Sequence, residues 1–156
     1  MNSIRLVFIT VLALNSFGCS NVPNDKTKNQ VSISDKTTNL DNLKIETLPE
    51  KYAPFMSSSV GILLTPTNID TKAYKLVFKT KEGLFLSWGK DTNNQVKELG
   101  KEVVYDKDLY WSYNFDNKFS QDEITLTVFD KANDKKLKEL SLKVVISKEG
   151  FASVVK

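Results

Sequence analysis

The stretch Ile124-Thr-Leu-Thr-Val-Phe-Asp130 decides the fold, because apolar residues alternate with Thr125 and Thr127 along it. Successive side chains of an extended strand point to opposite faces, so a period of two predicts a strand with one buried face. A polar segment of turn-forming residues follows, and Leu140-Ser-Leu-Lys-Val-Val-Ile146 then resumes the alternation. The pattern predicts an antiparallel hairpin whose turn lies at Asp130–Lys136.

Alternating runs of the same kind recur upstream, from about residue 53. They are rich in β-branched and aromatic residues and lie at Val60–Leu64, Tyr74–Lys79, Leu84–Trp88, Val103–Tyr105 and Leu109–Phe115. Short strands with hairpin-length links predict an all-β fold, a two-sheet antiparallel sandwich of about seven strands over residues 43–156.

Four segments are less clearly determined by the alternating pattern. Lys81-Glu-Gly83 is expected to close a hairpin, and the spacing of Val96, Leu99 and Val103 allows one helical turn. Leu43–Tyr52 is open between a strand, a helical turn and linker. In the C-terminal tail, Phe151, Val154 and Val155 either cover the edge of the sandwich or form a further strand.

The C-terminal hairpin resembles the last hairpin of bacterial immunoglobulin-like domains, and Trp111-Ser-Tyr-Asn-Phe115 is similar to an aromatic strand of such modules. The resemblance implies an immunoglobulin-like sandwich. The chain has a single cysteine, so the Cys…Trp…Cys pattern of antibody-type domains is absent and no subfamily is implied.

The first eighteen residues have the pattern of a secretory signal peptide. Arg5 supplies a positive charge, Leu6–Leu14 is an apolar core, and small residues stand at Ser16 and Gly18. Ser16-Phe17-Gly18-Cys19 resembles the lipobox of bacterial lipoproteins, although Ser16 stands where leucine is usual. The resemblance implies that Cys19 is diacylated, with acyl chains such as palmitate, and becomes the mature N-terminus. The alternative is ordinary secretion with a chance cysteine at the cleavage site.

Residues 19–42 are expected to be a lipid-anchored flexible linker. The segment is rich in Asn, Asp, Ser, Thr and Lys, and its few apolar residues are scattered. The domain boundaries are therefore predicted as a signal peptide at 1–18, the linker at 19–42 and the sandwich at 43–156. The expected location is the cell membrane, with the domain on its extracytoplasmic face.

Composition excludes several classes of function. The chain has no histidine and one cysteine, which excludes Ser-His-Asp and Cys-His catalysis, histidine metal sites and intrachain disulfides. Arg5 is the only arginine, and the lysines alternate with acidic residues, so no nucleic-acid surface is expected. No nucleophile elbow and no phosphate-binding glycine loop is present.

Aromatic residues concentrate between 105 and 119 and give the candidate binding residues Tyr110, Trp111 and Tyr113. Trp111, Tyr113 and Phe115 share one face of a strand. That face is either a platform for sugar rings or a protein, or the core of the sandwich, with Tyr110 alone looking outward. The second interpretation is favoured, because an apolar strand face is normally buried.

Acidic residues suggest two further sites, both disfavoured. Asp106 with Asp108, and Asp122 with Glu123, raise the possibility of a glycosidase, but all four are expected to be solvated turn residues. Hard oxygen ligands for calcium are present at Asp130, Asn133 and Asp134, but lysines surround them and the spacing is not that of a calcium loop. No catalytic residue, metal or cofactor is expected.

These observations favour a non-enzymatic surface lipoprotein that presents a β-sandwich to an unidentified envelope protein or glycan. One alternative is a carbohydrate-binding module that uses the aromatic residues of 105–119. Another is an accessory or inhibitor domain for an envelope enzyme, which a protruding loop, such as that at Gly89–Val96, would favour. The exposure of the large aromatic side chains distinguishes these functions.

Overall fold

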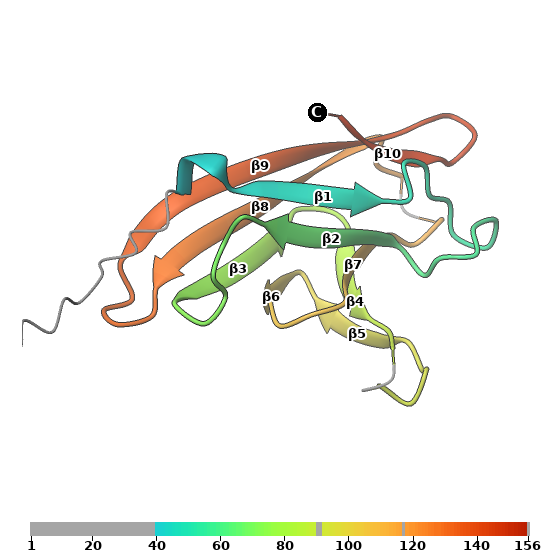
Figure 1. Cartoon of the computed structure of the whole chain (residues 1–156). Helices are drawn as coiled ribbons and strands as arrows, with labels where there is room; N and C mark the ends of the chain where they lie inside the picture. Colours follow the sequence, from blue (N-terminus) through green and yellow to red (C-terminus); the bar gives the residue numbers. More distant parts are fainter. Residues whose placement is uncertain (1–39, 90–91, 117, 156) are drawn as a thin grey trace, which may run out of the picture. The chain divides into compact units, whose positions relative to one another are not determined.

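The structure is a computed structural model that describes residues 40–89, 92–116 and 118–155. The predicted signal peptide and Cys19 lie outside the described residues, as does the predicted linker up to residue 39. The elements in chain order are a 3-10 turn η1 (Leu40–Asn42), β1 (Lys44–Leu48), β2 (Ile62–Thr67), β3 (Tyr74–Thr80), β4 (Leu84–Ser87), β5 (Lys97–Gly100), β6 (Glu102–Val104), β7 (Leu109–Ser112), β8 (Gln121–Asp130), β9 (Lys136–Ile146) and β10 (Ala152–Val155) (Figure 1).

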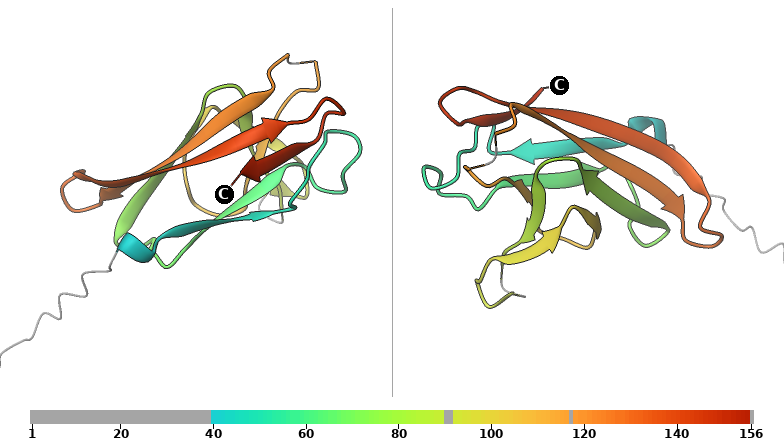
Figure 2. Two further views of the ribbon diagram at one scale, coloured as in Figure 1. Left: turned by 90° about the horizontal axis from the view of Figure 1, so that it is seen from above. Right: turned by 180° about the vertical axis from the view of Figure 1, so that it is seen from behind.

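The strands form two antiparallel sheets that pack on one another (Figures 1 and 2). Sheet A has the order β1-β2-β7-β4-β5, and sheet B has the order β10-β9-β8-β3-β6. The predicted all-β two-sheet sandwich is confirmed. The described residues form ten strands where about seven were predicted, because β1, β5 and β10 arise from segments without a clear alternating pattern.

The strand order bears on the predicted immunoglobulin-like fold. In such sandwiches the strands A-B-E-D form one sheet and G-F-C the other. The order β1-β2-β7-β4 in sheet A and β9-β8-β3 in sheet B is compatible with this arrangement. Strands β5, β6 and β10 are additions to it, and the immunoglobulin-like assignment stays a prediction.

The long hairpin of β8 and β9 is present as predicted. Its register runs from Gln121 opposite Val145 to Phe129 opposite Lys136, with one irregularity next to Phe129. The Asp130 carboxylate accepts a hydrogen bond from the backbone N–H of Ala132 (2.8 Å), which fixes the start of the turn.

Two local predictions were wrong. Lys81–Gly83 does not close a hairpin, because β3 belongs to sheet B and β4 to sheet A. The segment is an arch that carries the chain from one sheet to the other. The region of Val96–Val103 contains no helical turn; it forms β5 and β6, and Gly100, the last residue of β5, has a φ of +88°, which favours glycine.

The folded domain also begins slightly earlier than predicted. Leu40 packs against the core, and its carbonyl accepts a hydrogen bond from Lys138 Nζ (2.6 Å). Asn68 Nδ2 donates to the carbonyl of Asn42 (3.0 Å). The turn η1, assigned to the linker by composition, is therefore part of the domain.

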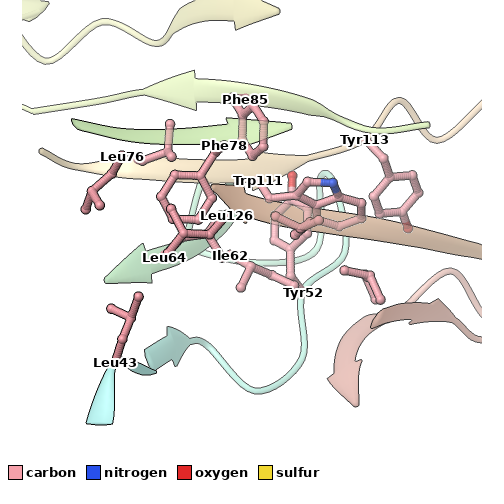
Figure 3. Close-up of a cluster of buried hydrophobic side chains, with 14 of the residues drawn as sticks. Leu43, Tyr52, Ile62, Leu64, Leu76, Phe78, Phe85, Trp111, Tyr113 and Leu126 are labelled. Carbon is pink, nitrogen blue, oxygen red and sulfur yellow. The ribbon is translucent and has the colours of Figure 1, made fainter. Parts of the chain in front are cut away.

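The core consists of the inward-facing residues of both sheets (Figure 3). Alternation along β8 buries Ile124, Leu126 and Val128, as predicted. Trp111 is the largest fully buried side chain and has no exposed surface, while Tyr110 next to it is half-buried. The core position favoured for Trp111 is thus confirmed.

Replacing Trp111 with alanine is expected to lower the free energy of unfolding by about 3–5 kcal/mol, because the loss of buried surface and the cavity left behind both destabilise the fold. Tyr110→Ala, on the outer side of the same strand, should cost about 1 kcal/mol. Denaturant melts of the two variants measure both values. Equal losses would mean that β7 does not direct Trp111 into the core.

Candidate functional site

The most densely bonded side chain of the described residues is the carboxylate of Asp122, at the start of β8. It accepts hydrogen bonds from the backbone N–H groups of Lys81 (3.1 Å), Glu82 (2.9 Å) and Gly83 (2.9 Å), which together make up the arch between the sheets. Its own neighbour, Glu123, donates a further backbone N–H (2.7 Å).

Two side chains complete the set of donors around Asp122. The indole Nε1 of Trp111 donates to the carboxylate at 2.8 Å, and the Thr80 hydroxyl donates a short hydrogen bond. Asp122 is 5% exposed. The prediction that it is a solvated turn residue was therefore wrong.

The pKa of Asp122 reflects this environment. Burial on its own would raise the pKa, because it disfavours the charged form, but the hydrogen bonds from Thr80, Gly83, Glu82 and Trp111 outweigh it. The net result is a pKa below the usual aspartate value. Such a carboxylate stays ionised and accepts hydrogen bonds, so its arrangement is suited to joining the sheets and not to donating a proton.

Replacing Asp122 with asparagine removes the negative charge. It also places an N–H₂ group, which cannot accept a hydrogen bond, where one carboxylate oxygen now accepts hydrogen bonds. We expect Asp122→Asn to lower the free energy of unfolding at neutral pH by about 3 kcal/mol, since several buried donors lose their acceptor. Because the folded pKa lies below the unfolded one, the contribution of Asp122 is complete above about pH 4 and is lost as the pH falls through the folded value.

The measurement is a series of denaturant melts of both proteins from pH 7 to pH 2. The parent should lose stability on acidification more steeply than Asp122→Asn. Parallel pH profiles would contradict the assignment of the charged form to the folded state. Glu98→Gln, which changes an exposed carboxylate on β5 of the other sheet, is the matched control.

The aromatic platform, the less favoured interpretation of this strand, is not formed. Trp111 and Tyr113 are buried, and the Tyr113 hydroxyl donates to the carbonyl of Gly150. Phe115 lies beyond the end of β7 and is exposed. Neither buried ring presents a face to a ligand, so the candidate binding residues Trp111 and Tyr113 were wrongly placed in a platform.

Tyr110 is the one candidate binding residue that faces outward, and its ring meets the edge of Trp88 at 6.3 Å between centroids. Burial, and secondarily the charge of Asp108, raise the pKa of Tyr110, so its hydroxyl stays protonated at neutral pH. Trp88 also lines a pocket of about 210 Å³, which Asp106 and Asp108 line as well. Trp88 follows the last residue of β4, and its place in the alternating run Leu84–Trp88 predicted a strand residue and gave no signal of a binding role.

The acidic turn at Asp130–Asp134 is occupied by its own contacts. Asp130 accepts hydrogen bonds from Ala132 and Asn133, and Asp134 forms an ion pair with Lys75 (2.7 Å). Among the residues that the structure describes, no group of three or more metal-ligating side chains is found. The turn thus has the structure of a β-hairpin closure.

The loop at Ala53–Ser59, between β1 and β2, was not predicted from the sequence. Its turn is closed by the backbone N–H groups of Met56 (3.3 Å) and Ser57 (3.1 Å), which both donate to the Ala53 carbonyl. The Phe55 side chain on this turn is 98% exposed, and Phe55 has a φ of +66°, a region that large side chains rarely adopt. Met56 beside it is also exposed.

Further exposed apolar side chains lie at the same end of the sandwich. Tyr52 pairs with Ala152, which follows the turn at Ser147–Phe151, and Phe115 contacts Gly150 in that turn. We call this end, formed by residues 53–59, 113–116, 118–119 and 147–151, the apolar end. Its exposed residues are Phe55, Met56, Phe115 and Phe151.

The opposite end of the sandwich, here called the attachment end, carries η1. Lys138 at the start of β9 contacts Leu40, and the β8–β9 turn lies beside the β2–β3 loop, where Lys131 Nζ donates to the Thr71 carbonyl (2.8 Å). Since β8 and β9 span the domain, η1 and the loop between β1 and β2 lie at opposite ends (Figures 1 and 2).

Comparison with known protein families, with curated proteins and with solved structures found no match. Within the described ranges, no helix has the length and apolar character needed to cross a bilayer.

Proposed function

We propose that the chain is a non-enzymatic lipoprotein, anchored in the cell membrane through Cys19, whose β-sandwich is an interaction domain outside the cytoplasm. The leader sequence and the position of the one cysteine support the anchor. The buried, hydrogen-bonded state of Asp122 supports a structural role for this carboxylate, the one that is buried among the described residues.

The observation that carries the proposal is the exposed Phe55–Met56 pair at the apolar end, remote from the point where the chain enters the domain. Side chains of this kind are stable in water only at a cost, and exposed apolar clusters mark sites of interaction. The positive φ of Phe55 adds strain that a well-bonded turn holds in place. The partner we propose is a protein with an apolar pocket that accepts these two side chains.

The predicted linker fits this role. Residues 20–39 are 20 in number, and a flexible chain of that length has a root-mean-square span of about 25 Å. With the anchor on one side and the apolar end on the other, the domain would hold Phe55 away from the bilayer. Tethering also raises the local concentration of the domain at the membrane.

The anchor is tested by Cys19→Ala. We expect the variant to leave the membrane fraction, because two acyl chains supply the stable attachment and no helix of the described domain is long and apolar enough to cross a bilayer. Cell fractionation and immunoblotting measure the distribution. A variant that stays in the membrane as firmly as the parent contradicts lipidation at Cys19.

The apolar end is tested by placing a photo-crosslinking amino acid at Met56, in cells that contain the anchored protein. We expect one discrete protein adduct, and we expect Phe55→Ser to remove most of it, because the two side chains would enter the same pocket. Lys135, exposed at the attachment end, is the matched position and should give no such adduct.

Adducts of equal yield at positions 56 and 135 would contradict a specific role for the apolar end. The absence of any adduct at position 56 would favour the second candidate, a carbohydrate-binding function. The observation behind that candidate is the pocket at Trp88, where an aromatic ring and the carboxylates of Asp106 and Asp108 are combined. Aromatic faces and hydroxyl-accepting carboxylates are suited to sugar rings.

A further inference from the structure

A groove runs along the open side of the sandwich, between the edge strand of sheet A and strands β9 and β10 of sheet B. Its volume is about 1130 Å³. At the apolar end the two sheets are joined by the backbone of Tyr52 and Ala152, with N–H···O distances of 2.9 and 2.7 Å. Beyond this bridge the sheets separate and the groove opens.

The groove has an apolar floor that nothing in the described domain covers. Ile45 of β1 and Leu140, Leu142 and Val154 of sheet B line it and are only half-buried. Leu48, at the end of β1, is 64% exposed. Additional burial of these residues would stabilise any strand that extends sheet A here.

The strand that borders the groove, β1, pairs with β2 alone. It is five residues long and is in continuous register with β2, from Lys44 opposite Thr67 to Leu48 opposite Leu63. The other edge strands are shorter, and β5 pairs with β4 across a register shift. A regular, unpaired edge is a template for a further strand.

The side chains of β1 indicate what that strand is. Lys44 and Glu46 are exposed on one face, and Ile45 between them faces the core. If a second copy of β1 pairs antiparallel with the first around Ile45, Lys44 of each copy lies opposite Glu46 of the other. Registers centred on Lys44 or on Glu46 instead place like charges opposite one another, which is unfavourable.

We propose that β1 is a self-association edge, through which two copies of this chain pair as antiparallel strands centred on Ile45. The interface is isologous, with a two-fold axis at Ile45, and it joins the two A sheets into one continuous sheet. One Lys44–Glu46 pair lies on each side of the axis, with one residue from each copy, and the two Ile45 side chains meet beside the groove.

The proposal is tested by charge reversal, with the association of residues 20–156 measured by sedimentation velocity over a range of concentrations. This segment contains no cysteine or lipid, and every contact described above lies within it. We expect a monomer–dimer equilibrium for the parent. Lys44→Glu and Glu46→Lys should each weaken the dimer by about tenfold or more, because two attractive cross-strand pairs become repulsive.

Two rescue arms make the experiment specific. The double variant K44E/E46K has the composition of the parent and should recover its association, and an equimolar mixture of the two single variants should form a heterodimer. Lys97→Glu changes the net charge equally at the other edge of sheet A and should leave the dimer unchanged.

The proposal is overturned if the parent stays monomeric at every concentration, or if the charge-reversed variants associate as well as the parent. Association that Phe55→Ser abolishes and charge reversal does not would assign the contact to the apolar end instead. Because neither lipid nor an envelope partner is present, the result does not depend on the function proposed above.

Discussion

The carboxylate of Asp122 is the interaction on which the rest of the sandwich depends. The folded domain contains no cysteine, so no disulfide joins its sheets. Asp122 lies on sheet B, yet it accepts hydrogen bonds from Trp111 of sheet A and from all three residues of the arch between the sheets. A buried carboxylate is stable only with such a complete set of donors, and the set exists only when both sheets are in place.

This arrangement also positions the apolar end. Gly83 is required in the arch, because a Cβ there would collide with the Trp111 indole. Trp111 in turn stacks on Tyr113, and Tyr113 meets the edge of Tyr52. The Tyr52 hydroxyl bonds to Ser112 (2.7 Å) just before the loop that carries Phe55. A series of packed aromatic rings thus connects the arch to the residue that precedes the Phe55 loop. This packing fixes the position of the loop.

Sequence patterns predicted the parts of this structure that follow from alternation. The hairpin of β8 and β9 and the buried Trp111 belong to that class, since one face of each strand is continuously apolar. Asp122 is in phase with Ile124, Leu126 and Val128, so its inward direction was readable, but its polarity suggested a turn. The exposure of Phe55 was not readable, and neither was the choice between a tail that covers the sandwich edge and the strand β10. Both depend on the Tyr52–Ala152 bridge, which joins segments a hundred residues apart.

The two proposed interaction surfaces, the β1 edge and the apolar end, are separate on the domain, but use of one would disfavour use of the other. In an antiparallel pair of β1 strands, the apolar ends of the two copies point in opposite directions, and so do their attachment ends. A pair anchored in one bilayer would then lie with its strands along the membrane, whereas a single domain extends Phe55 away from it. The proposed lipid anchor would concentrate the chains in a plane and so favour the pair. Self-association through β1 would therefore compete with presentation of the apolar end, and a partner that binds Phe55 would in turn favour the unpaired domain.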